Sequence, residues 1–133
     1  MKKQTKIISW VLQVIVVVIL LPTVIGKLSS NLQAIELFTK LDMEPNGRYI
    51  IGILELIAVV LLLIPASVVY GASLAAGLMV GAVMGHITKL GFEGQMGMMA
   101  GMAATAVLLS FIILFLRRTQ LPIINRMFGN IKS

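Results

Sequence analysis

The sequence contains no cysteine. A disulfide framework, a CxxC redox pair, a thiolate nucleophile and an iron–sulfur cluster all require cysteine sulfur, so these kinds of site are excluded. A redox role for this chain would therefore depend on a bound cofactor or on a partner protein.

Charged residues are scarce too, at 12% of the chain, whereas 59% of its residues are apolar and its mean hydropathy is +1.02. A soluble domain has about 25% charged residues, so this chain has too few polar side chains to cover a water-facing surface. We therefore interpret it as a membrane protein. At about 20 residues per spanning helix, its 133 residues accommodate four spans with short connections, which excludes large enzymatic folds.

Four apolar blocks are long enough to cross a bilayer, and they lie at residues 7–25, 49–64, 68–88 and 95–116. Backbone groups in lipid must be hydrogen-bonded internally, and the alternating pattern of barrel strands is absent, so the blocks are expected to be helices. The predicted fold class is all-α: a single integral membrane four-helix bundle over residues 1–133. The first block is longer than the apolar core of a signal peptide and lacks an A-x-A cleavage pattern, so we expect it to be retained.

The charged residues are distributed unevenly between the two ends of this bundle. The segments that hold the termini contain seven Lys or Arg and no acid, whereas the connections at the other end contain four residues of each sign. By the positive-inside rule, both termini are then cytoplasmic. Because the basic residues flank membrane spans, we interpret them as determinants of topology and contacts to anionic lipid, and we expect no binding of nucleic acid.

Two shorter segments have one apolar face and one polar face. Ser30 begins a capping-box pattern, and we predict a short amphipathic helix over residues 31–41, in the outer loop between the first two spans. Pro122 can open a second amphipathic helix over residues 122–132, on the cytoplasmic leaflet.

Small residues recur at four-residue spacing in the third block, at Gly77, Gly81 and Gly85. In lipid such residues let helix backbones approach closely, so we predict that this row packs against another helix of the same bundle. A dimer interface is the alternative for the same row, which leaves a homo-oligomer open. Met99 and Met102 lie in the outer half of the fourth block, where they either fill packing gaps or form an adaptable wall for an apolar ligand.

Glu55 is the only acidic residue inside a predicted span. A charged side chain at this depth is costly, so it normally faces a partner or a wet cavity. Side chains tilt toward the N-terminus of their helix, which directs Glu55 of the second block and His86 of the third toward each other, and Lys27 at the end of the first block leans toward them. We expect these three groups to meet, either as a structural clasp or as a small pocket for a ligand or a proton.

No metal site is predicted, because one histidine and one intramembrane carboxylate are too few ligands. Haem ligation by His86 and a methionine is disfavoured, since the chain has a single histidine and no CxxCH motif. A quinone needs no metal ligand and is compatible with the expected pocket.

Short motifs follow one another in a fixed order at the end of the first block and within the second and third: Gly26-Lys27-Leu28, Ile51-Gly52-Ile53-Leu54-Glu55-Leu56, Tyr70-Gly71-Ala72 and Gly81-Ala82-Val83-Met84-Gly85-His86. In these motifs the chain resembles, from Ile7 to Leu116, the DoxX-like family of small membrane proteins. The resemblance implies a four-helix membrane bundle with Lys27, Glu55 and His86 at the family's polar positions. Relatives include a small subunit associated with thiosulfate:quinone oxidoreductase, proteins of thiol and oxidative-stress complexes, and eukaryotic receptor chaperones.

The leading hypothesis is a DoxX-like protein of the bacterial inner membrane, acting as an accessory or quinone-associated subunit of a redox system. Glu55 and His86 would be catalytic by moving a proton, and Lys27, Met99 and Met102 would line the outward-facing ligand site with them. The expected partners are the lipid bilayer and a redox protein. The alternative is a non-enzymatic binding or assembly protein that uses the same groove for a lipid or a partner helix, because fold alone does not fix function.

Overall fold

The computed structural model describes residues 2–29, 31–91 and 94–118 of the chain. Within these ranges every regular element is a helix, as predicted, and four helical segments are long and apolar enough to cross a membrane. The protein is therefore an all-α membrane bundle. The elements are α1 (Lys3–Leu28), α2 (Leu32–Lys40), α3 (Asn46–Leu63), the 3-10 turn η1 (Pro65–Ser67), α4 (Val68–Gly85), the π-helix η2 (His86–Leu90) and α5 (Gln95–Leu116).

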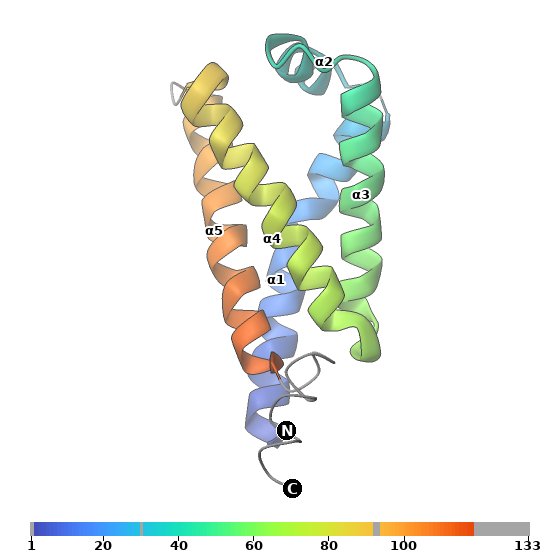
Figure 1. The fold of residues 1–133 in the computed structure, drawn as a ribbon, viewed down its shortest axis with the longest axis vertical. Helices are drawn as coiled ribbons and strands as arrows, with labels where there is room; N and C mark the ends of the chain where they lie inside the picture. The colour runs from blue at the N-terminus through green and yellow to red at the C-terminus, as the bar shows by residue number, and fades with distance from the viewer. Residues whose placement is uncertain (1, 30, 92–93, 119–133) are drawn as a thin grey trace, which may run out of the picture.

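The four long helices form a ring (Figure 1). α1 packs against α3 and α5, and α4 packs against the same two helices. At one end of the bundle α1 begins, α5 ends and η1 joins α3 to α4; we call it the η1 end. α2 lies across the other end, which we call the α2 end, and contacts α1, α3 and η2.

The core between the four long helices consists of aliphatic side chains and alanines. Leu20, Leu62, Ala72, Ala106 and Ile113 are fully buried there. The alanines on α4 and α5 suit close packing of these two helices, because a methyl side chain adds little to the distance between backbones.

The outer faces of the same helices are apolar as well. Val18, Ile53, Tyr70 and Phe115 each expose half or more of their surface. A water-soluble bundle would place charged residues on such faces. The bundle therefore presents one apolar surface to its own core and another to the lipid bilayer.

The observed helices extend or divide the predicted apolar blocks. α5 has the predicted bounds, whereas α1 is longer at both ends than 7–25 and α3 begins at Asn46, before the predicted 49–64. The block at 68–88 is α-helical only to Gly85 and continues as the π-helix η2. The pattern of apolar residues does not predict where an α-helix, with 3.6 residues per turn, changes to the wider π-helix, because both helix types bury the same kinds of residue.

α2 corresponds to the predicted amphipathic helix at 31–41, but its cap differs. The cap is Asn31 rather than the predicted Ser30, and the Asn31 side chain accepts a hydrogen bond from the Gln33 backbone N–H at 2.8 Å. Asparagine caps helices as well as serine does, and a cap reaches the N–H two or three residues further on. α2 buries Leu37 and Phe38 on its inner face. The predicted helix at 122–132 lies outside the described residues.

The prediction that the glycine row of α4 packs against another helix fails at Gly77 and Gly81, whereas a Cβ atom added at Gly85 would lie 3.3 Å from Leu41 Cδ2. A Cβ atom added at Gly77 or Gly81 would meet no atom within 4 Å. At Gly71, nearer η1, it would lie 2.7 Å from the backbone nitrogen of Leu62 and 2.9 Å from the carbonyl carbon of Leu61. α4 therefore touches α3 closely at the η1 end and diverges from it toward the α2 end (Figure 1), so the close contact is formed by Gly71 and the prediction for Gly77 and Gly81 is wrong.

Candidate functional site

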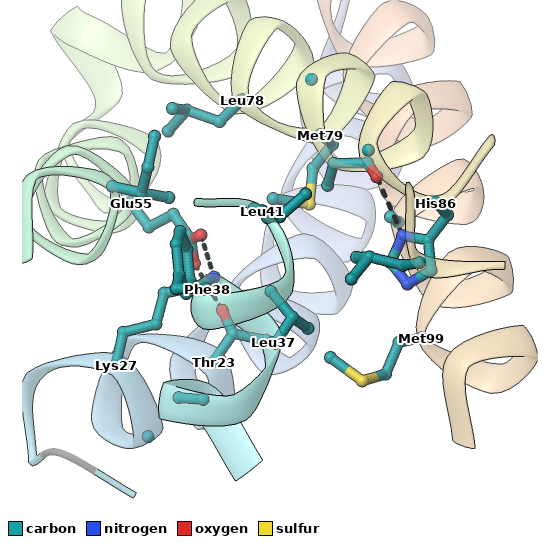
Figure 2. A pocket seen from close by; sticks show the side chains of 18 of the residues that line it. Thr23, Lys27, Leu37, Phe38, Leu41, Glu55, Leu78, Met79, His86 and Met99 are labelled. Atoms are coloured by element: carbon teal, nitrogen blue, oxygen red, sulfur yellow. Dashed lines mark hydrogen bonds and ion pairs between the residues drawn. The ribbon is translucent and has the colours of Figure 1, made fainter. Parts of the chain in front are cut away.

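A cavity of about 710 Å³ lies at the α2 end, where α3 and α4 have diverged. All four long helices line it, and residues of α2 and η2 complete its walls (Figure 2). The residues predicted to form the ligand site all line this cavity: Lys27, Glu55, His86, Met99 and Met102. Its volume lies within the range of about 300–1,000 Å³ that is usual for small-molecule sites.

One wall of the cavity holds a buried ion pair between α1 and α3 (Figure 2). Lys27 Nζ donates a hydrogen bond to Glu55 Oε1, and the Thr23 hydroxyl donates to Glu55 Oε2. Glu55 is fully buried, and Lys27 is 14% exposed. Both carboxylate oxygens therefore have a donor and the ammonium balances the charge, which is what a carboxylate inside a membrane requires.

Gly52 allows α1 to approach α3 at this ion pair. A Cβ atom at Gly52 would lie 3.1 Å from Lys27 Cβ and 2.9 Å from Leu28 Cδ2. Gly52 precedes Glu55 by three residues, so the two lie on neighbouring parts of one helix face. The absence of a side chain thus brings the Lys27 stem against α3, close enough for its ammonium to reach Glu55.

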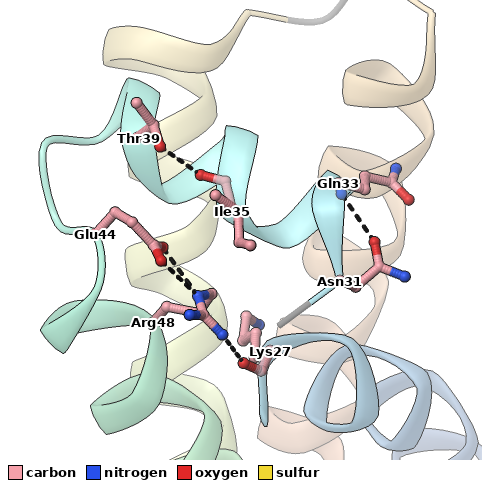
Figure 3. Close-up of polar contacts among 7 residues, drawn as sticks. All are labelled: Lys27, Asn31, Gln33, Ile35, Thr39, Glu44 and Arg48. Carbon is pink, nitrogen blue, oxygen red and sulfur yellow. Dashed lines mark hydrogen bonds and ion pairs between the residues drawn. The ribbon is translucent and has the colours of Figure 1, made fainter. Parts of the chain in front are cut away.

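Arg48 ties the end of α1 to the start of α3 (Figure 3). Its Nε donates to both carboxylate oxygens of Glu44, at 3.0 and 2.9 Å, and its Nη1 donates to the backbone carbonyl of Lys27. The last carbonyls of an α-helix have no partner within the helix, so this contact satisfies the end of α1. It also holds Lys27 in register with Glu55.

His86 lies on the opposite side of the cavity from the ion pair (Figure 2). It is the first residue of η2, it is 3% exposed, and its Nδ1 lies 2.8 Å from the carbonyl oxygen of Ala82. Because a carbonyl oxygen only accepts, Nδ1 carries a hydrogen, and Nε2 is the basic nitrogen of the neutral ring.

The prediction that three titratable groups meet holds for Lys27 and Glu55 but not for His86. Among the described residues, the hydrogen-bond donors to Glu55 are Lys27 and Thr23. Glu55 and His86 belong to two segments that diverge toward the α2 end, whereas Lys27 lies on α1, which packs against α3. His86 therefore shares the cavity with the ion pair without joining it.

The two predicted methionines line the cavity from α5. Met99 lies near His86 in Figure 2, and its sulfur is 3.8 Å from Gln33 Nε2. Met102 lines the cavity one turn further along α5. Both side chains are unbranched and flexible, so they can adapt to the shape of an apolar ligand.

Thr23, Arg48 and Gly52 contribute to this site but are missing from the sequence prediction. Thr23 lies four residues before Lys27 and hence on the same face of α1, a spacing that the sequence does display. The role of Gly52 depends on where α1 crosses α3, which no spacing within one helix reveals.

The ring of Phe38 lies 5.9 Å from Lys27 Nζ, within the range of a cation–π contact.

The arrangement offers hydrogen bonds on two sides of an apolar space. The Lys27 ammonium has three N–H groups, of which Glu55 takes one. His86 presents a ring nitrogen that can accept a proton or, when protonated, donate one. In the described part of the chain, no group of three or more His, Cys, Asp or Glu side chains could hold a metal ion.

A protein-family model described as the DoxX-like family matches residues 11–115, which is most of the chain. Comparison with curated proteins and with solved structures finds no match. The matched range includes all of α3 and α4, α1 from residue 11 onward and α5 up to residue 115, and it contains Lys27, Glu55 and His86. The chain belongs to the DoxX-like family of membrane proteins.

Proposed function

We propose that the cavity binds an uncharged, largely apolar molecule of the quinone type, and that the protein is an accessory subunit of a redox system in the bacterial inner membrane. The supporting observation is the cavity itself, about 710 Å³ in volume, with hydrogen-bonding groups on two facing sides. A quinone carries a carbonyl group at each end of a flat ring and an apolar tail. Its shape and polarity match polar groups placed across an apolar space.

The charges around the cavity favour a neutral ligand. Lys27 and Glu55 balance each other. Lys89, which also lines the cavity, lies 3.6 Å from the Asp42 carboxylate, so its charge has a partner as well. A charged ligand would lose its hydration in this apolar space without gaining an opposite charge in return. A neutral ligand with hydrogen-bond acceptors avoids that cost.

The chain itself would contribute hydrogen bonding and proton transfer. Lys27 can donate to one ligand carbonyl, because two of its N–H groups are not needed by Glu55. His86 Nε2 can take up or release a proton at the other carbonyl, which is the property required of a general acid–base. The electrons would be exchanged with a redox partner protein.

A second candidate function is non-enzymatic binding or assembly, in which the cavity accepts a lipid chain or a partner helix. The observation that favours it is the complete pairing of Glu55, since both carboxylate oxygens already have donors within the protein. Such an acid can serve purely as a clasp between α1 and α3. The two candidates differ in the ligand that the protein retains on purification.

Gly81→Leu is expected to block ligand binding without unfolding the protein. Gly81 lines the cavity, and an added Cβ atom would meet no atom within 4 Å, so the rest of a leucine side chain would extend into the space of the ligand. Val80→Leu is the matched control, because Val80 is 42% exposed and lies outside the cavity lining. Native mass spectrometry of the detergent-purified protein, alone and with added decylubiquinone, measures the bound ligand.

Wild type and Val80→Leu are expected to retain the quinone, and Gly81→Leu to bind it roughly tenfold less because leucine occupies the ligand volume. A phospholipid or a client protein that copurifies in the absence of quinone binding would favour the assembly function. Equal quinone binding by all three proteins would show that the cavity is not the binding site.

Both termini are expected in the cytoplasm, which places the cavity in the outer half of the membrane. The basis is the excess of Lys and Arg at the η1 end. Because the chain has no cysteine, Asn46→Cys and Gln4→Cys each introduce a single thiol at an exposed position. In intact cells an impermeant thiol reagent should label Asn46→Cys, and it should label Gln4→Cys only after permeabilisation. The reverse labelling pattern would show that the protein has the opposite orientation in the membrane.

A further inference from the structure

A second polar cluster lies at the η1 end, far from the cavity. Arg117 follows the last residue of α5, is 3% exposed, and donates from Nε to the Ser9 hydroxyl at 2.6 Å. Ser9 donates to Gln13 Oε1 at 2.7 Å, and Gln13 Nε2 donates to the Leu62 carbonyl at 2.7 Å. Ser9 and Gln13 are fully buried. These hydrogen bonds link α5, α1 and α3, and they hold the guanidinium in one orientation.

Among the residues that the structure describes, no acidic side chain is placed to neutralise Arg117. The sequence contains no Asp or Glu before Glu36 and none after Glu93. Glu93 precedes α5, whose 22 residues span about 33 Å at 1.5 Å per residue. Glu55 is already paired with Lys27, and the remaining acids belong to α2 and its connection to α3.

Within the described ranges, Arg117 is therefore a desolvated cation without a compensating charge. Burial lowers its pKa, because the charged form has lost part of its water. A guanidinium carries five N–H groups. In the described part of the chain the Nε group has an acceptor, and the four N–H groups on Nη1 and Nη2 have none. A forked set of donors is thus available to an oxyanion.

The neighbouring groups increase the positive potential at this end. α1 begins at Lys3 without a side-chain cap and without an acid in its first turn, so its first N–H groups attract negative charge. Lys2, Lys3 and Lys6 are exposed nearby in the sequence. Arg118 differs from Arg117, because it is exposed, donates to the Phe115 carbonyl at 2.7 Å and stacks on the Phe115 ring.

We propose that Arg117, positioned by Ser9, binds a phosphate group that supplies the missing negative charge. The planar fork of arginine matches two phosphate oxygens with two parallel hydrogen bonds. The phosphate belongs either to the headgroup of an anionic phospholipid or to a soluble phosphate. Exposed apolar residues on the adjacent turns of α1 and α5, among them Ile8, Val11 and Phe111, offer a surface for acyl chains in the first case. The site is independent of the cavity.

The test titrates the delipidated, detergent-purified full chain and follows its melting temperature. The probes are dioleoyl phosphatidylglycerol, dioleoylglycerol, which has the same acyl chains without phosphate, and inorganic phosphate. Stabilisation by phosphatidylglycerol alone would assign the site to a lipid headgroup, and stabilisation by inorganic phosphate would assign it to a soluble phosphate; each supports the proposal. Stabilisation by neither probe, or an equal response to dioleoylglycerol, would overturn it.

Variants separate the site from general basic charge. Arg117→Lys keeps the charge without the fork, and Ser9→Ala keeps the guanidinium without its support, so each is expected to weaken phosphate binding roughly tenfold. Arg118→Gln, the matched control, removes a positive charge one residue away and is expected to change binding by less than about twofold. Ser9→Thr retains the hydroxyl and should restore binding. Wild-type affinity in both Arg117→Lys and Ser9→Ala, or a loss in Arg118→Gln as large as theirs, would contradict the proposal.

Discussion

Lys27→Met is expected to lower the free energy of unfolding by about 3 kcal/mol. The substitution keeps an apolar stem but removes the ammonium, which leaves the fully buried Glu55 with the Thr23 hydroxyl as its remaining donor. Removing one partner of a buried ion pair is costly because the other charge cannot regain its water. Unfolding of the purified protein by dodecyl sulfate in mixed micelles measures the change.

Lys40→Met is the control for this measurement, since Lys40 is exposed on α2 and its loss should change stability by less than about 0.5 kcal/mol. The double variant Lys27→Met, Glu55→Leu removes both charges and is expected to recover most of the stability. In this double variant the Thr23 hydroxyl still has a hydrogen-bond acceptor, because it lies 2.7 Å from the Leu20 carbonyl oxygen. A double variant as unstable as Lys27→Met would show that the loss does not come from the unpaired Glu55.

The same double variant distinguishes the two proposed roles of the ion pair. It keeps the fold while it removes the polar wall of the cavity. Quinone binding should fall if Lys27 donates a hydrogen bond to the ligand, and it should persist if the pair only joins α1 to α3. Stability and binding are thus measured on one protein.

The spans could be predicted from the sequence because their signals are local. A run of about 20 apolar residues requires a helix in lipid whatever surrounds it. The four runs correspond to α1, α3, α4 with η2, and α5, although α1 and α3 extend beyond their runs. α2 likewise has a cap and an amphipathic face within its own sequence. The boundary at Gly85 differs because the α-helix continues there as a π-helix, a change that composition does not encode.

The site could be predicted only in part, because it depends on distances between helices. Burial cost predicts that Glu55 has a partner, but the sequence offers both Lys27 and His86 on neighbouring spans and does not choose between them. The tilt of side chains indicates that Glu55 and His86 lean toward each other, but it does not indicate how far apart α3 and α4 lie. That separation follows from packing at Gly71, at the other end of the same two helices.

Gly71→Ala and Gly81→Ala are expected to have opposite effects on stability. At Gly71 the new Cβ atom would lie 2.7 Å from the Leu62 backbone nitrogen and 2.9 Å from the Leu61 carbonyl carbon, and backbone atoms cannot rotate away as side chains do. The two helices must then separate, at a cost of about 1–3 kcal/mol for overpacking. At Gly81 the same atom meets nothing within 4 Å, so alanine should raise stability slightly by its better helix propensity, by up to about 1 kcal/mol.

The two variants change the same residue type to the same residue type on one helix, so each is the control for the other. Melting temperatures in detergent should place Gly71→Ala below wild type and Gly81→Ala at or above it. Equal losses at both positions would mean that the whole glycine row is a packing seam, as the four-residue spacing by itself predicts. The cavity exists only where α4 diverges from α3. Equal losses would therefore also contradict the presence of the space in which the ligand is proposed to bind.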